Sequence, residues 1–409
     1  MVGEAFIRQS CNSRIQKLVL SLLLLLLSAC AAGNLKTPLD EPIKPVEFSP
    51  VSVEEWTLKN GLRVLYRYDD ELPLVRGSLV LKGGSLWEPE EQIGIVSAMG
   101  HLMRQGGAGS LNADSLDKTL EKLSANISSS FDSEMGKVRF KCLTADFDEV
   151  FSLFADVALR PQFENERLRL WKGQSIEGVK RRKDDPSTMA GIAFSQILFK
   201  GTKYGNVLGA KEVQAISRLD LLRMHRRFVR PNDAFLVLGG AIPREEAKKA
   251  IEEYFSDWKP RVGGLGVLQE VKAKPRPGIY FIEHPSVQST VYMGHLGPKR
   301  FTEDFYSILA FNEVFGAGGF ASRLTKRVRE QLGLAYSVYG AIGPGRVKGR
   351  NVVVLQTKSD STSLAVTESN GLLEEIQSNP VKEGEIMIVK RNLDKTFYIK
   401  FDQTHKLIS

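Results

Sequence analysis

Cysteine is scarce in this sequence, with three residues in a chain of 409. Cys11 and Cys30 both lie near the N-terminus, in a segment interpreted below as a signal and its cleavage site, so Cys142 is left alone. We therefore expect no intrachain disulfide, and packing must stabilise the fold. Cys142 lies in the strand-like run KVRFKCL, which predicts a buried small apolar residue rather than a reactive thiol.

Features of two other protein classes are also missing. Lysine and arginine exceed aspartate and glutamate by 56 − 48 = 8, and no basic tract is interleaved with aromatic residues, so nucleic acid is not an expected partner. No apolar run reaches the roughly 20 residues of a membrane-spanning helix. The glycine-rich stretch FGAGGFASRL lacks the pattern of a phosphate-binding loop and predicts a tight connection before a helix.

The N-terminus has the three parts of a bacterial secretory signal. Basic residues precede an apolar run, Leu18–Leu27, which ends in Leu-Ser-Ala-Cys. That ending resembles the bacterial lipobox, which implies that residues 1–29 are removed and that Cys30 carries lipid. Ala31 follows the cysteine, and by the same resemblance this favours the outer membrane, facing the periplasm. The proline-containing residues 30–50 are predicted to form a tether.

Beyond the tether the sequence predicts an α+β fold of two related α/β domains. Residues 51–258 and 279–409 each contain strand-like runs that alternate with amphipathic helical runs, and residues 259–278 are rich in Pro, Gly and Lys, as in a linker. Asn60-Gly61 between two alternating runs predicts a hairpin. Two landmarks recur in both halves at the same offset. The pair Gly106-Gly107 matches Gly318-Gly319 (319 − 107 = 212), and the strand-like run from Lys137 matches the one from Gly349 (349 − 137 = 212), which favours a duplication.

The second half is expected to be incomplete. After position 145 the first half continues for 258 − 145 = 113 residues, whereas after the equivalent position 357 the second continues for 409 − 357 = 52. The shortfall corresponds to the last helices and the buried strand AFLVLGGAI of the first half. A sheet without that strand exposes unpaired backbone groups. A truncated reading frame is the favoured interpretation, with a reduced domain as the alternative.

Several stretches in order resemble the pitrilysin/insulinase family of metallopeptidases, which includes mitochondrial processing peptidase. They are LKNGLRVL, GIVSAMGHLMRQGG, KRRKDDP, RFVRPNDAFLVLGG and FGAGGFASRLTKRVREQLGLAYSV. The resemblance runs from about residue 52 to the end. It implies homologous mainly antiparallel α/β domains that face each other across a chamber for an extended peptide.

Active members of that family carry His-x-x-Glu-His on the first helix and a glutamate on a later one. Two imidazoles four residues apart share a zinc ion, and the glutamate between them is the general base. The matching positions here are Ser97, Gly100 and His101, and the later glutamate maps to Gly178, beside Glu177. We therefore expect no metal site and no catalytic residue, and interpret His101 as a partly buried histidine held by a backbone carbonyl or by Ser97.

The resemblance implies a second functional pair, an arginine and a tyrosine seven residues apart that bind the substrate backbone. The stretch REQLGLAY supplies Arg329 and Tyr336, on either side of a turn at Gly333. A guanidinium donates hydrogen bonds to a peptide carbonyl, and a phenol steadies a developing oxyanion. Without the resemblance, a surface arginine and a packed tyrosine explain the same residues.

These observations predict the non-zinc, substrate-binding subunit of a heterodimeric periplasmic peptidase. The expected partners are a zinc-bearing relative of the same family, extended or unfolded peptides, and the membrane through the lipid on Cys30. No cofactor is expected in this chain, because zinc would be held by the partner. A non-enzymatic scaffold lipoprotein and a weak metallopeptidase acting alone are the alternatives.

Overall fold

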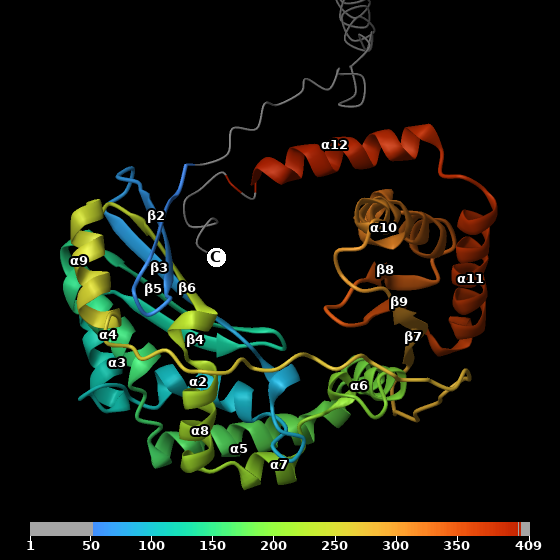
Figure 1. Ribbon diagram of the computed structural model, residues 1–409. Helices are drawn as coiled ribbons and strands as arrows, with labels where there is room; N and C mark the ends of the chain where they lie inside the picture. Colours follow the sequence, from blue (N-terminus) through green and yellow to red (C-terminus); the bar gives the residue numbers. More distant parts are fainter. Residues whose placement is uncertain (1–51, 400, 402–409) are drawn as a thin grey trace, which may run out of the picture. The chain divides into compact units, whose positions relative to one another are not determined.

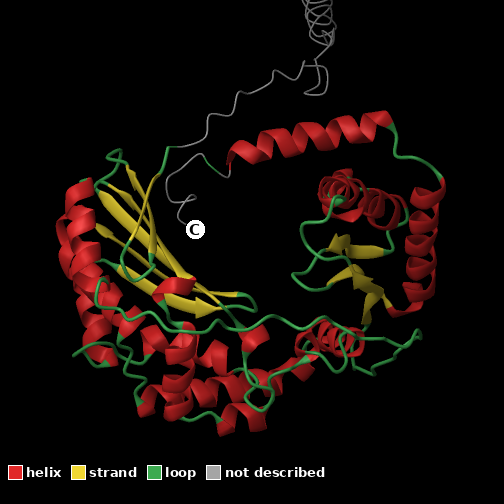
Figure 2. Ribbon diagram, in the orientation of Figure 1, coloured by secondary structure: helices red, strands yellow, loops and turns green. Residues whose placement is uncertain are grey.

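The computed structural model describes residues 52–399 and 401 (Figures 1 and 2). The predicted signal peptide, Cys30 and the predicted tether lie outside these residues. The described chain forms two mainly antiparallel sheets, each packed with helices, and so confirms the predicted α+β class. No helix within the described residues is long and apolar enough to span a membrane.

The first sheet has six strands in the order β1-β2-β6-β3-β5-β4. Only the β2–β6 pair is parallel, and the other neighbours are antiparallel. The strands are β1 (Glu54–Thr57), β2 (Arg63–Tyr68), β3 (Leu74–Lys82), β4 (Asn126–Phe131), β5 (Met135–Leu143) and β6 (Ala234–Gly240).

Helices cover one face of this sheet, which alternation along the strands makes apolar (Figure 2). In β5, for example, Val138, Phe140 and Cys142 are buried against them, as predicted for the cysteine. The helices of the first half are α2 (Ile95–Gln105), α3 (Ala113–Lys122), α4 (Phe147–Leu159), α5 (Asn165–Arg181), α6 (Pro186–Leu198), α7 (Ala210–Ala215), α8 (Arg218–Phe228) and α9 (Arg244–Phe255). Of these, α6 packs instead against the second sheet, where the Phe194 ring lies 5.7 Å from that of Tyr292.

The predicted hairpin joins β1 to β2. Gly61 adopts a φ of +92°, a conformation that glycine reaches without strain. The Asn60 side chain donates hydrogen bonds to the carbonyls of Phe255 and Trp258, at 2.6 and 3.0 Å, just after α9. The turn therefore ties the first strands to the last helix of this half, 195 residues away in sequence.

The second sheet has three strands in the order β7-β9-β8, which repeats the order β3-β5-β4 of the first. Of the two landmarks of the duplication at the strand starts, Lys137 is the third residue of β5 and Gly349 the first of β9. The strands are β7 (Gln288–Gly297), β8 (Ala335–Gly343) and β9 (Gly349–Lys358). The helices are α10 (Phe305–Asn312), α11 (Thr362–Ser378) and α12 (Glu383–Ile399). Two further segments, Glu313–Ala317 and Thr325–Gln331, are π-helical, with i→i+5 hydrogen bonding.

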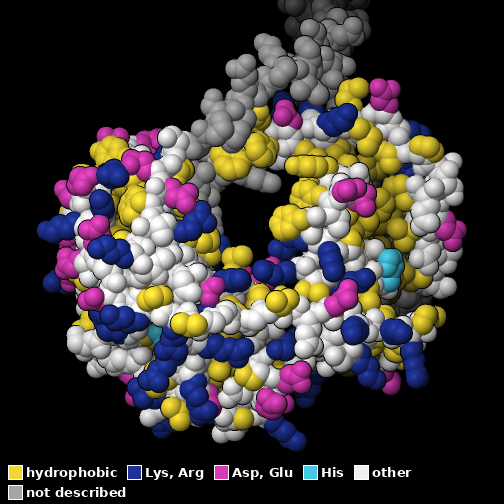
Figure 3. Space-filling model, in the orientation of Figure 1, with side chains coloured by type: hydrophobic (Ala, Val, Ile, Leu, Met, Phe, Trp, Pro, Cys, Tyr) yellow, Lys and Arg dark blue, Asp and Glu magenta, His cyan; other side chains and the backbone are white. Residues whose placement is uncertain are grey.

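The hydrophobic core of the second half contains fewer buried residues than that of the first. In the described part of the chain β7 pairs with β9 only, so its other edge has no neighbouring strand. The apolar side chains of Ile279 and Phe281, shortly before β7, are 101% and 86% exposed. Hydrophobic side chains also gather on the surface around α10 (Figure 3), where Tyr306 is 78% exposed.

Candidate functional site

The position of α2 is set by a buried carboxylate at its N-terminus. Glu88 is 4% exposed, and its carboxylate accepts hydrogen bonds from the backbone N–H groups of Gly94 (3.0 Å) and Val96 (3.4 Å). These N–H groups have no partner inside the helix, so a carboxylate there both caps the helix and complements its dipole. Burial raises the pKa of Glu88 to about 7, although the two N–H groups and Lys203 lower it.

The two zinc-ligand positions of α2 lie together on its exposed side. Val96, Met99 and Met103 are buried in the core, whereas Ser97 and His101, four residues apart, are exposed on one face. His101 is exposed, although partial desolvation lowers its pKa. The predicted hydrogen bond to a backbone carbonyl or to Ser97 is wrong, since no hydrogen bond within the described chain holds the imidazole.

Gly100 fills the position of the general base, and its environment leaves no room for a side chain. A Cβ atom built on Gly100 would lie 2.6 Å from the backbone nitrogen of Phe131 and 3.0 Å from the carbonyl carbon of Ser130, both in β4. The Ser129 hydroxyl donates a 2.6 Å hydrogen bond to the Gly100 carbonyl. The helix therefore rests directly on the β4 backbone, and any larger residue would force the two apart.

The third ligand position is open but also lacks a ligand. A Cβ on Gly178 of α5 would meet nothing within 4 Å, and the neighbouring Glu177 is exposed and paired with Arg181 at 3.1 Å. No group of three or more His, Cys, Asp or Glu side chains in the described chain could hold a metal ion. The residues present therefore do not fit the zinc site of the family that the sequence resembles.

The structure brings Arg329 and Tyr336 together. Arg329 lies in the wide helical segment Thr325–Gln331, Gly333 makes the turn with a φ of +59°, and Tyr336 follows at the start of β8. The Arg329 guanidinium carbon lies 5.2 Å from the centre of the Tyr336 ring. These two residues therefore share one surface, as the predicted substrate site requires.

Phe320, which the sequence did not predict as a site residue, lies beside this pair. The Phe320 ring centre lies 5.0 Å from the Arg329 guanidinium carbon, so the cation contacts two aromatic rings. Phe320 is 63% and Tyr336 79% exposed. Phe320 belongs to the stretch FGAGGFASRL, which predicts only a connection; the signal for its role was an aromatic residue within a glycine-rich turn close to Arg329. Two exposed rings that hold a guanidinium form a surface suited to a peptide backbone.

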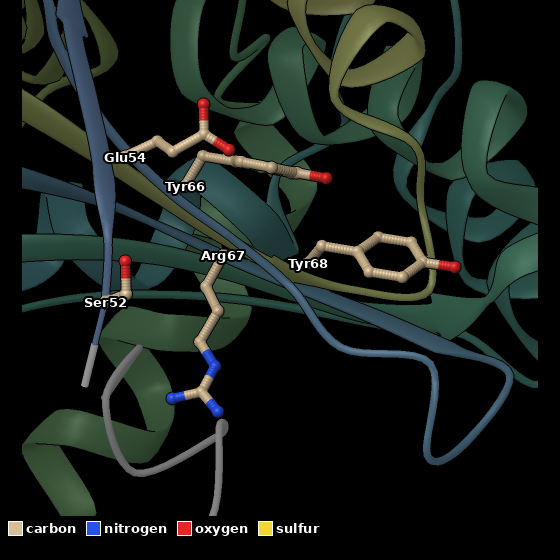
Figure 4. A pocket seen from close by; sticks show the side chains of 5 residues that line it. All are labelled: Ser52, Glu54, Tyr66, Arg67 and Tyr68. Carbon is tan, nitrogen blue, oxygen red and sulfur yellow. The ribbon is translucent and has the colours of Figure 1, made fainter.

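A cavity of about 400 Å³ lies far from this pair in the sequence, at the β1–β2 edge of the first sheet (Figure 4). It is lined by Ser52, Glu54, Tyr66, Arg67 and Tyr68. The Tyr66 hydroxyl is engaged, since it donates a 2.6 Å hydrogen bond to the Ile242 carbonyl, and burial raises the pKa of Tyr66 to about 12. The cavity contains neither an imidazole nor a thiol and suggests no catalytic chemistry.

Comparison with known families gives two adjacent matches. Residues 63–210 match the insulinase family, peptidase family M16, and residues 215–393 match the peptidase M16 inactive domain. Among curated proteins, an uncharacterized zinc protease of Rickettsia bellii is 23% identical over 80% of this chain and 79% of its own. A protein of Helicobacter pylori named non-peptidase homolog YmxG is 24% identical, over 81% of this chain and 76% of its own.

Solved structures share the fold. The peptidase M16 inactive domain from Pseudomonas fluorescens superposes with a TM-score of 0.78 at 24% identity, over 85% of this chain and 84% of that one. The periplasmic protease PqqL from Escherichia coli superposes with a TM-score of 0.76 at 16% identity, over 89% of this chain and 41% of that one.

Replacing Gly100, at the position of the base, and Gly178, at the position of the third ligand, should have opposite effects on stability. Gly100→Ala is expected to lower the free energy of unfolding by about 1–3 kcal/mol, because the new methyl group meets the β4 backbone. Gly178→Ala, on an open helix surface, should raise it by roughly 0.5–1 kcal/mol. Urea denaturation of both variants measures the difference. Equal stability of the two would contradict the close contact of α2 with β4.

Glu88 should make stability fall as pH rises. Its folded pKa of about 7 lies above the value of 4.5 expected for an unfolded chain, so its contribution is fully present below pH 4.5 and is lost as the pH rises through 7. Relative to Glu88→Gln, the free energy of unfolding should fall by on the order of 3 kcal/mol from pH 4.5 to about pH 8. Denaturation curves across this range measure it, with Glu90→Gln, at an exposed neighbouring position, as the control. A difference independent of pH would show that Glu88 is ionised throughout.

Proposed function

The chain belongs to the insulinase family of peptidases, family M16, and on that premise we propose that it is a non-catalytic, peptide-binding subunit that acts beside a zinc-bearing relative. One contrast supports this proposal above all. The surface formed by Arg329, Tyr336 and Phe320 is assembled and exposed, whereas α2 offers a single imidazole and no room for a base at Gly100. In such a pair this chain supplies substrate contacts and the relative supplies the metal.

Each side chain has a chemical task in this proposal. The Arg329 guanidinium, oriented by stacking on two rings, donates hydrogen bonds to a carbonyl of the bound peptide. The Tyr336 hydroxyl, on an exposed ring, is free to donate to the oxygen that gains charge when a partner's metal centre cleaves the bond. Phe320 provides an apolar wall beside them.

A non-enzymatic scaffold is the second candidate. The family match of residues 215–393 to an inactive domain and the name of the Helicobacter pylori relative favour it. A scaffold needs no exposed arginine–tyrosine surface, so measurable binding of an unfolded peptide separates the two. A weak peptidase acting alone is a third possibility, and tightly bound zinc in the purified protein would support it.

We also propose that the protein is lipid-anchored at Cys30 in the bacterial outer membrane and faces the periplasm. The order of basic residues, the apolar run Leu18–Leu27 and the Leu-Ser-Ala-Cys sequence support this. The anchor would restrict the peptide-binding surface to substrates in the periplasm.

Substitutions in the stacked surface should impair cleavage by the proposed pair. The protein is co-expressed with a zinc-bearing family member from the same genome, and turnover of a labelled peptide is measured. Tyr336→Phe should lower kcat by roughly 10²-fold, the effect of removing one oxyanion donor. Arg329→Ala should raise KM by about tenfold, because a charge-assisted hydrogen bond to the peptide is lost.

Matched controls come from the same two elements. Tyr339→Phe, three residues further along β8, and Lys326→Ala, in the same helical segment as Arg329, change exposed residues outside the stack. Both should leave kcat and KM unchanged. Unchanged turnover in Arg329→Ala and Tyr336→Phe, with the pair still assembled, would exclude the proposed role.

Replacement of Cys30 should release the protein from the membrane. In a bacterial host that carries out lipoprotein maturation, the unchanged chain is expected in the outer-membrane fraction, and Cys30→Ser in the soluble or uncleaved fraction. Cys11→Ser, in the same N-terminal segment, is the control and should not change the distribution. Mass spectrometry of the mature N-terminus measures the lipid directly. A Cys30→Ser protein that fractionates like the unchanged chain would argue against the anchor.

A further inference from the structure

The face of the first sheet that the helices leave open is basic. In β5, Lys137, Arg139 and Lys141 alternate with residues buried in the core, so the three cations lie on the opposite face of one strand. Side chains two residues apart on a strand are separated by roughly 7 Å. Three like charges therefore stand in a row on this strand.

Neighbouring strands extend this basic surface. Arg76 of β3 is in register with Lys141, and Arg67 of β2 reaches the same row through Gly239 of β6. Among the strand residues of this face the only acid is Glu55, which pairs with Arg63 at 2.8 Å. We call Arg67, Arg76, Lys137, Arg139 and Lys141 the basic face.

Two buried polar atoms on the basic face lack partners. Ser78 is in register with Arg139 and is fully buried, yet its hydroxyl makes no hydrogen bond with the described chain. The Nε atom of Arg139 is also buried without a partner. An unsatisfied buried donor costs free energy that an acceptor supplied by a ligand would recover. These two donors point to an acceptor-bearing ligand beside Arg139.

The concentration of positive charge is itself unfavourable in the free protein. Burial and the charge of Arg139 lower the pKa of Lys137, and Asp132 only partly offsets them. Like charges on neighbouring strand positions repel each other. A ligand with carboxylates would remove this repulsion when it binds.

The basic face also contains apolar side chains. Leu65, Phe235, Val237 and Val80 lie on the same side of their strands, between the cations of β2 and those of β5. Val80 is nearly buried and the other three are half-buried. Carboxylates and apolar side chains occur together in acidic polypeptides, whereas a nucleic acid would require phosphate contacts and more aromatic rings for stacking.

We propose that the open face of the first sheet binds acidic, partly apolar polypeptide segments, with Arg76 and Arg139 as the carboxylate-binding residues. The fork of each guanidinium donates to the two oxygens of a carboxylate, and the Ser78 hydroxyl donates to a neighbouring acceptor. The half-buried valine, leucine and phenylalanine side chains contact the apolar residues of the segment. This inference rests on the proposed function in that it names the class of peptide such a subunit would select.

The test uses the full chain and three labelled probes in fluorescence anisotropy. Two peptides of about ten residues share one apolar sequence and differ in charge, one with glutamates and one with lysines. The third probe is a single-stranded oligothymidylate with the same net charge as the acidic peptide. The acidic peptide should bind about tenfold more tightly than the basic one, and the preference should shrink at about 0.5 M salt.

Paired substitutions distinguish a specific effect of the basic face on binding from the effect of the protein's net charge. Arg76→Gln with Arg139→Gln should weaken binding of the acidic peptide about tenfold. Arg226→Gln with Lys211→Gln removes the same charge from exposed positions on α8 and α7 and should have no effect. Arg139→Glu should weaken binding of the acidic peptide and strengthen binding of the basic one, and loss of folding cannot produce these two opposite changes.

The outcomes distinguish this inference from the proposed function. Equal binding of both peptides, unchanged by the paired arginine substitutions, would overturn the acidic preference and leave the proposed function standing. Binding of neither peptide would overturn both. Tighter binding of the oligothymidylate than of the acidic peptide would assign the face to nucleic acid and overturn the inference.

Discussion

The one-sided covering of the six-stranded sheet determines most of what the first half of this protein can do. Because side chains alternate along each strand, burying one face against helices places every second residue on the other. In β5 this sends Phe140 and Val138 into the core and places Arg139, half-buried, on the opposite face of the sheet. The core, the position of α2 and the basic face all follow from this single arrangement.

The two halves have diverged in opposite directions. In the first, α2 is an amphipathic helix with Ser97 where the related enzymes have a zinc-binding histidine and with no room for a side chain at Gly100. In the second, the strand order of the first is repeated, and its surface holds Arg329 between Tyr336 and Phe320. The described chain thus combines an assembled arginine–aromatic surface with a first helix whose residues do not fit a zinc site.

Local signals in the sequence were sufficient to predict several features of the fold and of the candidate site. Asn60-Gly61 predicted the hairpin because few residue pairs suit that turn, and the arginine, Gly333 and Tyr336 order predicted a shared surface across one turn. Contacts between distant segments were not accessible. The approach of β4 to Gly100 joins residues about 30 positions apart, and the basic face exists only once strand register decides which side chains share a side.

The contact of Gly100 with β4 also bears on what an active site at this helix would require. A glutamate at this position needs space that the helix and strand have closed, and the Ser129 hydrogen bond holds them at that separation. An active site here would therefore need a shift of β4 away from α2, a base at position 100 and two further ligands at positions 97 and 178.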